Sequence, residues 1–217
     1  MIDFNNVSKR YANGFEALKH ISLKINKSEM VFITGHSGAG KSTLLKLIAG
    51  IEHASHGSVI VSGQNVGTLR ESALAVLRQN LGLVFQDHKL LFDRNVFENI
   101  ALPLYIGDYT PSEVAKRVRA ALDKVGLLGR EKHNPVMLSS GEQQRLCIAR
   151  AIVNRPSILI ADEPTGNLDT EYATQIVDLF KSFNQVGVTT LISTHDAAMI
   201  EKLKPRTIHL DHGMLTP

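Results

Sequence analysis

The chain has 217 residues, 43% of them hydrophobic, which is enough for one large domain with a substantial core. Lys and Arg number 24 against 21 Asp and Glu, and the net charge of +3 is too small to favour a nucleic-acid-binding surface. A single cysteine, Cys147, excludes an intrachain disulfide and favours a reducing compartment. No apolar run approaches about 18 residues and the first residues lack a signal-peptide pattern, so we expect any membrane segment to come from a partner.

Short apolar runs rich in β-branched residues recur along the chain and predict strands. Several runs are nearly continuous rather than alternating, as expected of strands that are covered on both faces. Helical patterns lie between them, and this alternation predicts an α/β fold with a helix-covered parallel sheet. The expected strands lie at 21–25, 30–34, 58–61, 81–85, 158–161, 188–193 and 207–210, and the expected helices at 42–51, 113–125 and 171–184.

The stretch from residue 88 to residue 155 differs from the rest, because it carries mostly helical patterns, with loops expected at 107–111 and 129–135. We interpret it as a helical insertion within the α/β core. The predicted organisation is one domain over residues 1–217, with a core formed by 1–87 and 156–217 and a helical subdomain at 88–155.

Residues 35–42 read G-H-S-G-A-G-K-S and fit the phosphate-binding pattern G-x-x-x-x-G-K-[ST], between an expected strand and an expected helix. Glycines let successive backbone N–H groups converge on a phosphate chain, and the following helix directs its positive end at the same charge. We expect Lys41 to bridge the β- and γ-phosphates and Ser42 to bind Mg²⁺. The alternative is a glycine-rich turn with a solvated lysine. The full expected cradle is Gly35, His36, Ser37, Gly38, Ala39, Gly40, Lys41, Ser42 and Thr43.

A carboxylate pair, Asp162-Glu163, follows the expected strand at 158–161. Asp162 can hold Mg²⁺ through water, and Glu163 can orient and polarise an attacking water molecule. The alternative, a strand followed by an acidic turn, is equally consistent with this segment on its own. Its occurrence in one chain with the phosphate loop favours a site for a nucleotide with Mg²⁺.

Residues 138–145, L-S-S-G-E-Q-Q-R, resemble the signature sequence of the ABC-transporter ATPase family, and further family motifs occur in the family's order. Tyr11 matches the position where the family stacks an aromatic ring on adenine, and Gln86 matches the Q-loop glutamine, a Mg²⁺ ligand. Residues 167–169 resemble the D-loop, and His195 resembles the switch histidine that contacts the γ-phosphate. The resemblance implies a P-loop NTPase ABC ATPase fold, with a RecA-like parallel-sheet core, an antiparallel β subdomain and a helical insertion.

The family resemblance also implies an ATP-dependent homodimer, in which two chains enclose two ATP molecules. The signature then faces the γ-phosphate held by the other chain. Ser139 and Glu142 also fit a capping box, and the two interpretations are compatible because a capped helix N-terminus is itself an anion site. The family usually has glycine in place of Ser140, so we expect weaker activation of the opposite site. The residues expected at the dimer contact are Ser139, Gly141, Glu142 and Asp169.

Plainer interpretations remain open for the isolated residues. A lone tyrosine near an N-terminus is usually structural, and a lone histidine at a strand end is usually a solvated surface residue. The order of the motifs favours the functional roles for Tyr11 and His195, whereas Gln86 would be uninformative without it.

Within the family, the phosphate loop, residues 86–91 and the P-T-G-N-L-D stretch at 164–169 most resemble bacterial cell-division ATPases. The resemblance implies a polytopic membrane partner, a peripheral position on the cytoplasmic face of the inner membrane, and control of septal peptidoglycan hydrolysis. Alternatives are a lipoprotein-release or MacB-type export ATPase, a soluble ABC ATPase acting on DNA or ribosomes, and a nucleotide-dependent switch without transport. Apolar residues at 90–92, 96–97 and 102–104 are equally consistent with a partner-docking surface and with buried core.

Overall fold

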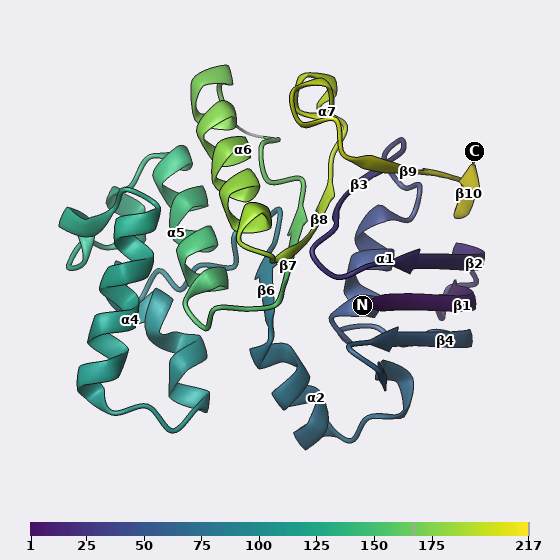
Figure 1. Cartoon of the computed structure of the whole chain (residues 1–217), viewed down its shortest axis with the longest axis horizontal. Coiled ribbons are helices and arrows are strands. Elements are labelled where there is room, and N and C mark those ends of the chain that lie inside the picture. Colours follow the sequence, from purple (N-terminus) through teal and green to yellow (C-terminus); the bar gives the residue numbers. More distant parts are fainter. Residues whose placement is uncertain (167, 217) are drawn as a thin grey trace.

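The computed structural model describes residues 1–166 and 168–216 and contains two sheets with helices packed around them (Figure 1). The larger sheet has the order β10-β9-β3-β8-β7-β6. Neighbouring strands from β9 to β6 run parallel, and β10 runs antiparallel to β9. The strands are β3 (Met30–Thr34), β6 (Leu81–Val84), β7 (Ile158–Asp162), β8 (Thr189–Ser193), β9 (Arg206–Asp211) and β10 (Met214–Thr216).

The predicted parallel sheet is confirmed, and its strands are buried on both faces. Val31 and Ile33 of β3 pack into one hydrophobic cluster and Phe32 into another, and all three are 0% exposed. Two covered faces explain why these segments read as continuous apolar runs rather than alternating ones. The edge strand β10 was not predicted, because three half-exposed or exposed residues give no run of that kind.

A second, antiparallel sheet has the order β2-β1-β4-β5. Strand β1 of this sheet was not predicted, because a β-bulge interrupts its alternation of buried and exposed residues. Ile2, Phe4 and Val7 are buried, and the register shifts between Phe4 and Val7, where Asn6 adopts a φ of 50°. The bulge changes the spacing of buried residues from two to three, which hides the pattern of a strand. The strands are β1 (Ile2–Arg10), β2 (Glu16–Ile25), β4 (His56–Val61) and β5 (Gln64–Asn65).

The helices agree with the predicted patterns, with two additions, α7 and α2. Helix α2 buries Leu74 and Leu77, a stripe too narrow to mark it in the sequence. Residues 88–155, all of which the structure describes, contain helices and turns but no strand. The helices are α1 (Lys41–Ile48), α2 (Glu71–Gln79), α3 (Val96–Ala101), α4 (Pro111–Lys124), α5 (Ser140–Ile152), α6 (Thr170–Gln185) and α7 (Ala197–Leu203).

The two faces of the parallel sheet are covered by different layers (Figure 1). Helices α3 to α6 supply one hydrophobic cluster, while α1 and the antiparallel sheet supply the other. The carboxyl ends of β3, β6, β7 and β8 consequently meet at one edge between the layers, which is where α/β proteins bind ligands. Within the described residues, no helix has the length and hydropathy to cross a membrane.

Candidate nucleotide-binding site

The turn between β3 and α1 has a backbone shape that requires glycine. Gly40 has a φ of 108°, and a Cβ atom there would lie 2.5 Å from the carbonyl oxygen of Ala17. Gly35 has a φ of 142°, and a Cβ atom there would meet the carbonyl oxygen of Leu210. L-residues rarely adopt either conformation, so any side chain at these positions would add both strain and a clash.

Helix α1 begins at Lys41 without a side-chain cap. Gly40 occupies the N-cap position and offers no side-chain acceptor for the first N–H groups of the helix. These groups have no partner within the helix, and the helix dipole makes this end positive. The end of α1 is therefore suited to a phosphate group.

The side chain of Lys41 folds back over the loop and is only 8% exposed. Its Nζ donates to the carbonyl oxygens of Gly35 at 2.8 Å and His36 at 3.2 Å. Because a buried ammonium group needs polar partners, these carbonyls hold the charge at the centre of the loop.

A cavity of about 540 Å³ opens over the phosphate loop. Three side chains reach it from the carboxyl ends of parallel strands, namely Gln86 after β6, Glu163 after β7 and His195 after β8. Its volume falls within the range of small-molecule sites. The residues proposed from the sequence that the structure brings together here are Gly35, His36, Ser37, Gly38, Ala39, Gly40, Lys41, Ser42, Thr43, Gln86, Glu163 and His195.

The carboxylate of Glu163 lies between the side chains of Lys41 and His195. Its Oε2 is 2.9 Å from Nδ1 of His195, and its Oε1 is 3.6 Å from Nζ of Lys41. Its backbone is left-handed, with a φ of 48°, and its N–H lies 3.0 Å from both the carbonyl oxygen and Oγ of Ser193. Non-glycine residues in this conformation are uncommon, and surrounding contacts must hold them there.

Asp162 lies one residue earlier and accepts a short hydrogen bond from the hydroxyl of Ser193. Together with Ser42 it lines a small space next to the main cavity. Carboxylate, hydroxyl and amide oxygens are the ligands that Mg²⁺ prefers, and Gln86 supplies the amide nearby. The donor set of Ser42, Gln86 and Asp162 therefore fits Mg²⁺. The sequence did not single out Ser193, because its role depends on the pairing of β7 with β8.

Two aromatic residues lie near the phosphate loop. The hydroxyl of Tyr11 is 3.2 Å from Oγ1 of Thr43, and the ammonium of Lys9 lies 4.9 Å from the centre of the tyrosine ring. Phe15 is 55% exposed and lines the cavity directly. Only Tyr11 was proposed from the sequence, and Phe15 is a second candidate for contact with a base. No sequence signal marked Phe15, because its place beside the phosphate loop depends on the tertiary structure.

The signature residues lie apart from this cavity. Ser139 caps α5 in a capping box with Glu142, which confirms the predicted capping box. A hydrogen bond from the backbone N–H of Ser139 is the main cause that holds the pKa of Glu142 below its usual value. The positive charge of Arg130, whose Nε is 3.3 Å from Oε1 of Glu142, also lowers this pKa. Gly141 packs on Tyr172, where an added Cβ atom would come within 3.1 Å of the ring. Within the described residues, none of these groups lines the phosphate-loop cavity.

The D-loop residues precede α6. Asp169 caps that helix, and its Oδ1 accepts a hydrogen bond of 3.0 Å from the backbone N–H of Tyr172. Asn167 lies outside the described residues. Asp169, like the signature, is not part of the cavity lining.

The apolar stretch after Gln86 divides between core and surface. Leu90 and Val96 are 7% and 0% exposed, whereas Leu91 and Phe92 are 38% and 52% exposed. The core interpretation therefore holds for Leu90 and Val96, and Leu91 and Phe92 remain available to a partner. An apolar cavity of about 430 Å³, lined in part by Lys89 and Ile106, lies between α2 and α5.

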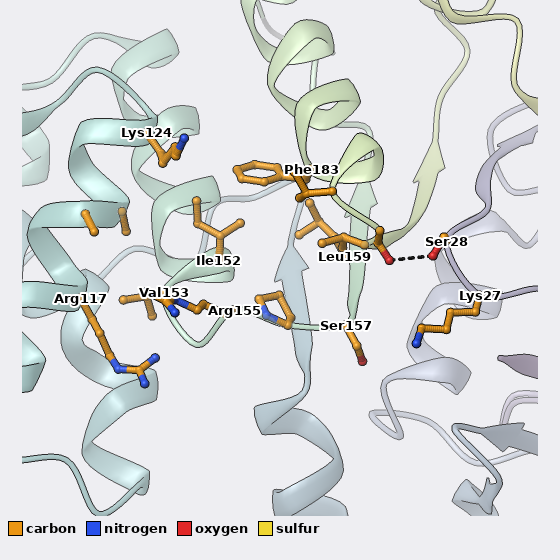
Figure 2. Close-up of a pocket in the computed structure, with 16 residues that line it drawn as sticks. Lys27, Ser28, Arg117, Lys124, Ile152, Val153, Arg155, Ser157, Leu159 and Phe183 are labelled. Carbon is orange, nitrogen blue, oxygen red and sulfur yellow. Dashed lines mark hydrogen bonds between the residues drawn. The ribbon is translucent and has the colours of Figure 1, made fainter.

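A larger cavity of about 720 Å³ lies at the opposite edge of the sheet. Figure 2 shows Arg117 and Lys124 of α4 on one side of it and Lys27 on the other, with Phe183 above its apolar floor. Its lining includes the segments that precede β3, β7 and β8, and none of the phosphate loop. We therefore assign a nucleotide to the smaller cavity, where the strands end.

Comparison with known families gives the class of protein. Residues 18–166 match the family described as "ABC transporter". MJ0796, solved as a dimeric bacterial ABC transporter cassette, has 35% identity and a TM-score of 0.93, with 100% of this chain and 97% of that chain covered. The same cassette was also solved as a dimer bound to ADP and Pi, with 34% identity and a TM-score of 0.93. The chain belongs to the ABC transporter ATPase family, and the predicted fold is confirmed.

Individual relatives show which members of the family this chain is similar to. Cell division ATP-binding protein FtsE of Escherichia coli (strain K12) is 50% identical, covering 99% of this chain and 97% of that protein. FtsE of Bacillus subtilis (strain 168) is 40% identical, covering 99% and 94%. FtsE of Mycobacterium tuberculosis is 42% identical with the same coverage. The resemblance to the cell-division members of the family is thus confirmed.

Proposed function

We propose that the chain is the ATP-hydrolysing subunit of a bacterial inner-membrane complex for cell division, as the names of its FtsE relatives suggest. The position of Glu163, between Lys41 and His195 at the phosphate loop, is the observation that carries the ATPase part. Phosphoryl transfer needs an anion-binding loop, a cation at the γ-phosphate and a group that orients water. All three are within reach of one cavity.

Each side chain has a defined role in this proposal. The loop N–H groups and Lys41 bind the β- and γ-phosphates, and Tyr11 stacks on adenine. Glu163 accepts a hydrogen bond from water and directs its oxygen at the γ-phosphorus. The water oxygen forms a bond to that phosphorus as the bond to the bridging oxygen breaks, Glu163 takes the water proton and returns it to solvent, and ADP and phosphate leave. His195 stabilises the charge on the γ-phosphate oxygens during this step.

Ser42, Gln86 and Asp162 are the proposed holders of Mg²⁺. When bound, Mg²⁺ would neutralise charge on the β- and γ-phosphates. The short hydrogen bond from Ser193 keeps the Asp162 carboxylate directed at this place. Gln86 follows β6, lines the nucleotide cavity and closely precedes the exposed Leu91 and Phe92 in the sequence, so it connects the two regions along the chain.

We propose further that two copies enclose ATP between the phosphate loop of one and the signature of the other. The separation of Ser139, Gly141 and Glu142 from the cavity of their own chain supports this arrangement. The N-terminus of α5 is positive and its N-cap residue Ser139 is exposed, as a phosphate contact requires. The dimeric MJ0796 cassettes are assembled structures of the same fold.

The proposed membrane partner is a polytopic protein of the FtsX type, with the chain held peripherally on the cytoplasmic face. The exposed side chains of Leu91 and Phe92 support a docking surface of this kind, and Lys89, which is close to them in the sequence, lines an apolar cavity. An apolar partner helix packs into such a hollow by burying its own apolar face. The net charge of +3 gives no support for direct nucleic-acid binding.

Two measurements test the two parts separately. Calorimetry of the purified chain should show ATP affinity that depends on Mg²⁺, together with phosphate release. If the folded protein showed neither Mg²⁺-dependent ATP affinity nor phosphate release, the ATPase proposal would be wrong. Co-purification with a tagged FtsX-type protein from the same organism tests the cell-division part. Retention by a lipoprotein-release or MacB-type membrane protein instead would move the function to export.

A further inference from the structure

Three metal-ligating side chains converge beside the phosphate loop. Nε2 of His36 lies 3.3 Å from Oδ1 of Asp211, and Nε2 of His212 lies 3.8 Å from the same oxygen. One ligating atom from each residue lies within 4.8 Å of the other two. The two imidazole rings have their centres 4.7 Å apart.

The backbone holds the two contributing segments together. His36 belongs to the phosphate loop, whereas Asp211 is the last residue of β9 and His212 begins the turn to β10. The N–H of Gly213 donates to the carbonyl oxygen of Ala39 at 3.1 Å, which fastens the turn to the loop. The tertiary structure therefore places the backbones of the three residues close together.

A second observation concerns the protonation of His36. Its Nδ1 is 2.7 Å from the carbonyl oxygen of Ser37. Because a carbonyl oxygen can only accept, Nδ1 must carry a hydrogen. Metal-binding histidines commonly donate one ring N–H to a backbone carbonyl, which leaves the other nitrogen to bind the ion. The remaining nitrogen, Nε2, is the one that faces Asp211.

We propose that His36, Asp211 and His212 form a binding site for a transition-metal ion of the Zn²⁺ type. Tetrahedral Zn²⁺ with bonds of about 2.0–2.1 Å places its ligand atoms roughly 3.3 Å from one another. The His36–Asp211 distance of 3.3 Å already matches, and the His212–Asp211 distance of 3.8 Å needs a small closure. Two imidazoles and one carboxylate suit Zn²⁺ rather than Mg²⁺. Water would complete the fourth position.

The bound ion would link the phosphate loop to the C-terminal hairpin. All three side chains are partly exposed, with fractions of 45%, 47% and 74% for His36, Asp211 and His212, so an ion can reach them. Metal binding at this place does not depend on the proposed ATPase role. An ordinary ion pair between His36 and Asp211 is the competing explanation of the geometry.

The test uses tag-free, full-length protein in buffer without nucleotide. ZnCl₂ is titrated by calorimetry into the wild type, His212→Ala, Asp211→Asn and a control, His53→Ala, which removes an exposed histidine outside the cluster. Wild type and control should bind one Zn²⁺ with equal affinity. Either cluster variant should weaken that affinity at least about tenfold. His36 is left intact because it lines the nucleotide cavity.

Thermal unfolding gives an independent measurement. Saturating Zn²⁺ should raise the Tm of the wild type and the control by several degrees, because the ion binds the folded chain, and should leave His212→Ala unchanged. Without metal, all four proteins should melt alike, which verifies their folding. Equal Zn²⁺ affinity in the wild type and both cluster variants, or no Zn²⁺ binding by the wild type, overturns the proposal.

Discussion

Glu163 and His195 are in direct contact, with Oε2 of the carboxylate 2.9 Å from Nδ1 of the imidazole. The contact exists because β7 and β8 are neighbouring parallel strands, paired as far as Asp162 and Ser193, so the residues that follow them emerge side by side. The second carboxylate oxygen lies 3.6 Å from Nζ of Lys41. One carboxylate thus connects the phosphate loop to the end of β8.

Replacing Glu163 with Gln should separate ATP binding from hydrolysis. The amide keeps the size of the side chain but is a far weaker base, so phosphate release should fall by about 10²–10⁴-fold. ATP affinity should change little, and ATP should then hold the chain as a dimer. Phosphate-release assays, calorimetry and gel filtration with ATP measure the three quantities. Turnover close to that of the wild type would remove Glu163 from the role of base.

Gly40→Ala should destabilise the fold. The φ of 108° and the approach of a Cβ atom to within 2.5 Å of Ala17 O should lower the unfolding free energy by about 1–3 kcal/mol. Gly129→Ala is the matched control, because a Cβ atom there has nothing within 4 Å. Chemical denaturation of the three proteins measures the difference. Equal losses in both variants would contradict the assignment of the strain to the phosphate loop.

Cys147 should be unreactive in the folded protein. Burial, as the largest effect, raises the pKa of its thiol from 9.0 to about 12, and its Sγ donates to the carbonyl oxygen of His88 at 3.3 Å. At pH 8 the native protein should react very slowly with a thiol reagent, whereas the protein unfolded in guanidinium should react fully. Rapid labelling of the native chain would contradict the burial of this side chain.

The raised thiol pKa also predicts a direction for stability at high pH. The unfolded chain loses the Cys147 proton near pH 9.0, and the folded chain retains it up to about pH 12. The contribution of this thiol to stability is therefore complete below pH 9 and is lost as the pH rises towards 12. Unfolding free energies from pH 8 to 11 should fall less steeply in Cys147→Ala than in the wild type.

Phe92→Glu should weaken the association with a membrane partner and leave ATP binding intact. The side chain is 52% exposed, so a charge there costs little in the isolated chain but would be buried in an apolar interface. Met214→Glu, at a residue 48% exposed on β10, is the control. Co-purification with the FtsX-type protein and calorimetry with ATP report the two effects. Loss of folding in Phe92→Glu would instead show that this residue belongs to the core.

Ser140→Gly should raise the ATPase rate of the dimer. Ser140 is exposed in the first turn of α5, where a side chain can crowd a phosphate held by the opposite chain. Steady-state phosphate release at several protein concentrations, together with gel filtration, tests this expectation. An unchanged rate and unchanged dimerisation would show that the identity of this residue does not matter.

The sequence by itself was enough to predict which residue types form the candidate site. The spacing of Gly35, Gly40 and Lys41 encodes a local loop, and a carboxylate pair at the end of an apolar run is also local, so both can be read without knowing where other segments lie. The parallel sheet was readable for the same reason, because burial on both faces leaves continuous apolar runs.

Only the tertiary structure decided what depends on distant contacts. The bulge at Asn6 concealed β1, and the place of Phe15 beside the phosphate loop is visible only in three dimensions. The approach of His36 to the β9–β10 turn depends on a hydrogen bond between distant parts of the chain, and so does the hydroxyl of Ser193 on Asp162. Strand pairing and loop contacts fix such relationships, and the order of residues along the chain does not show them.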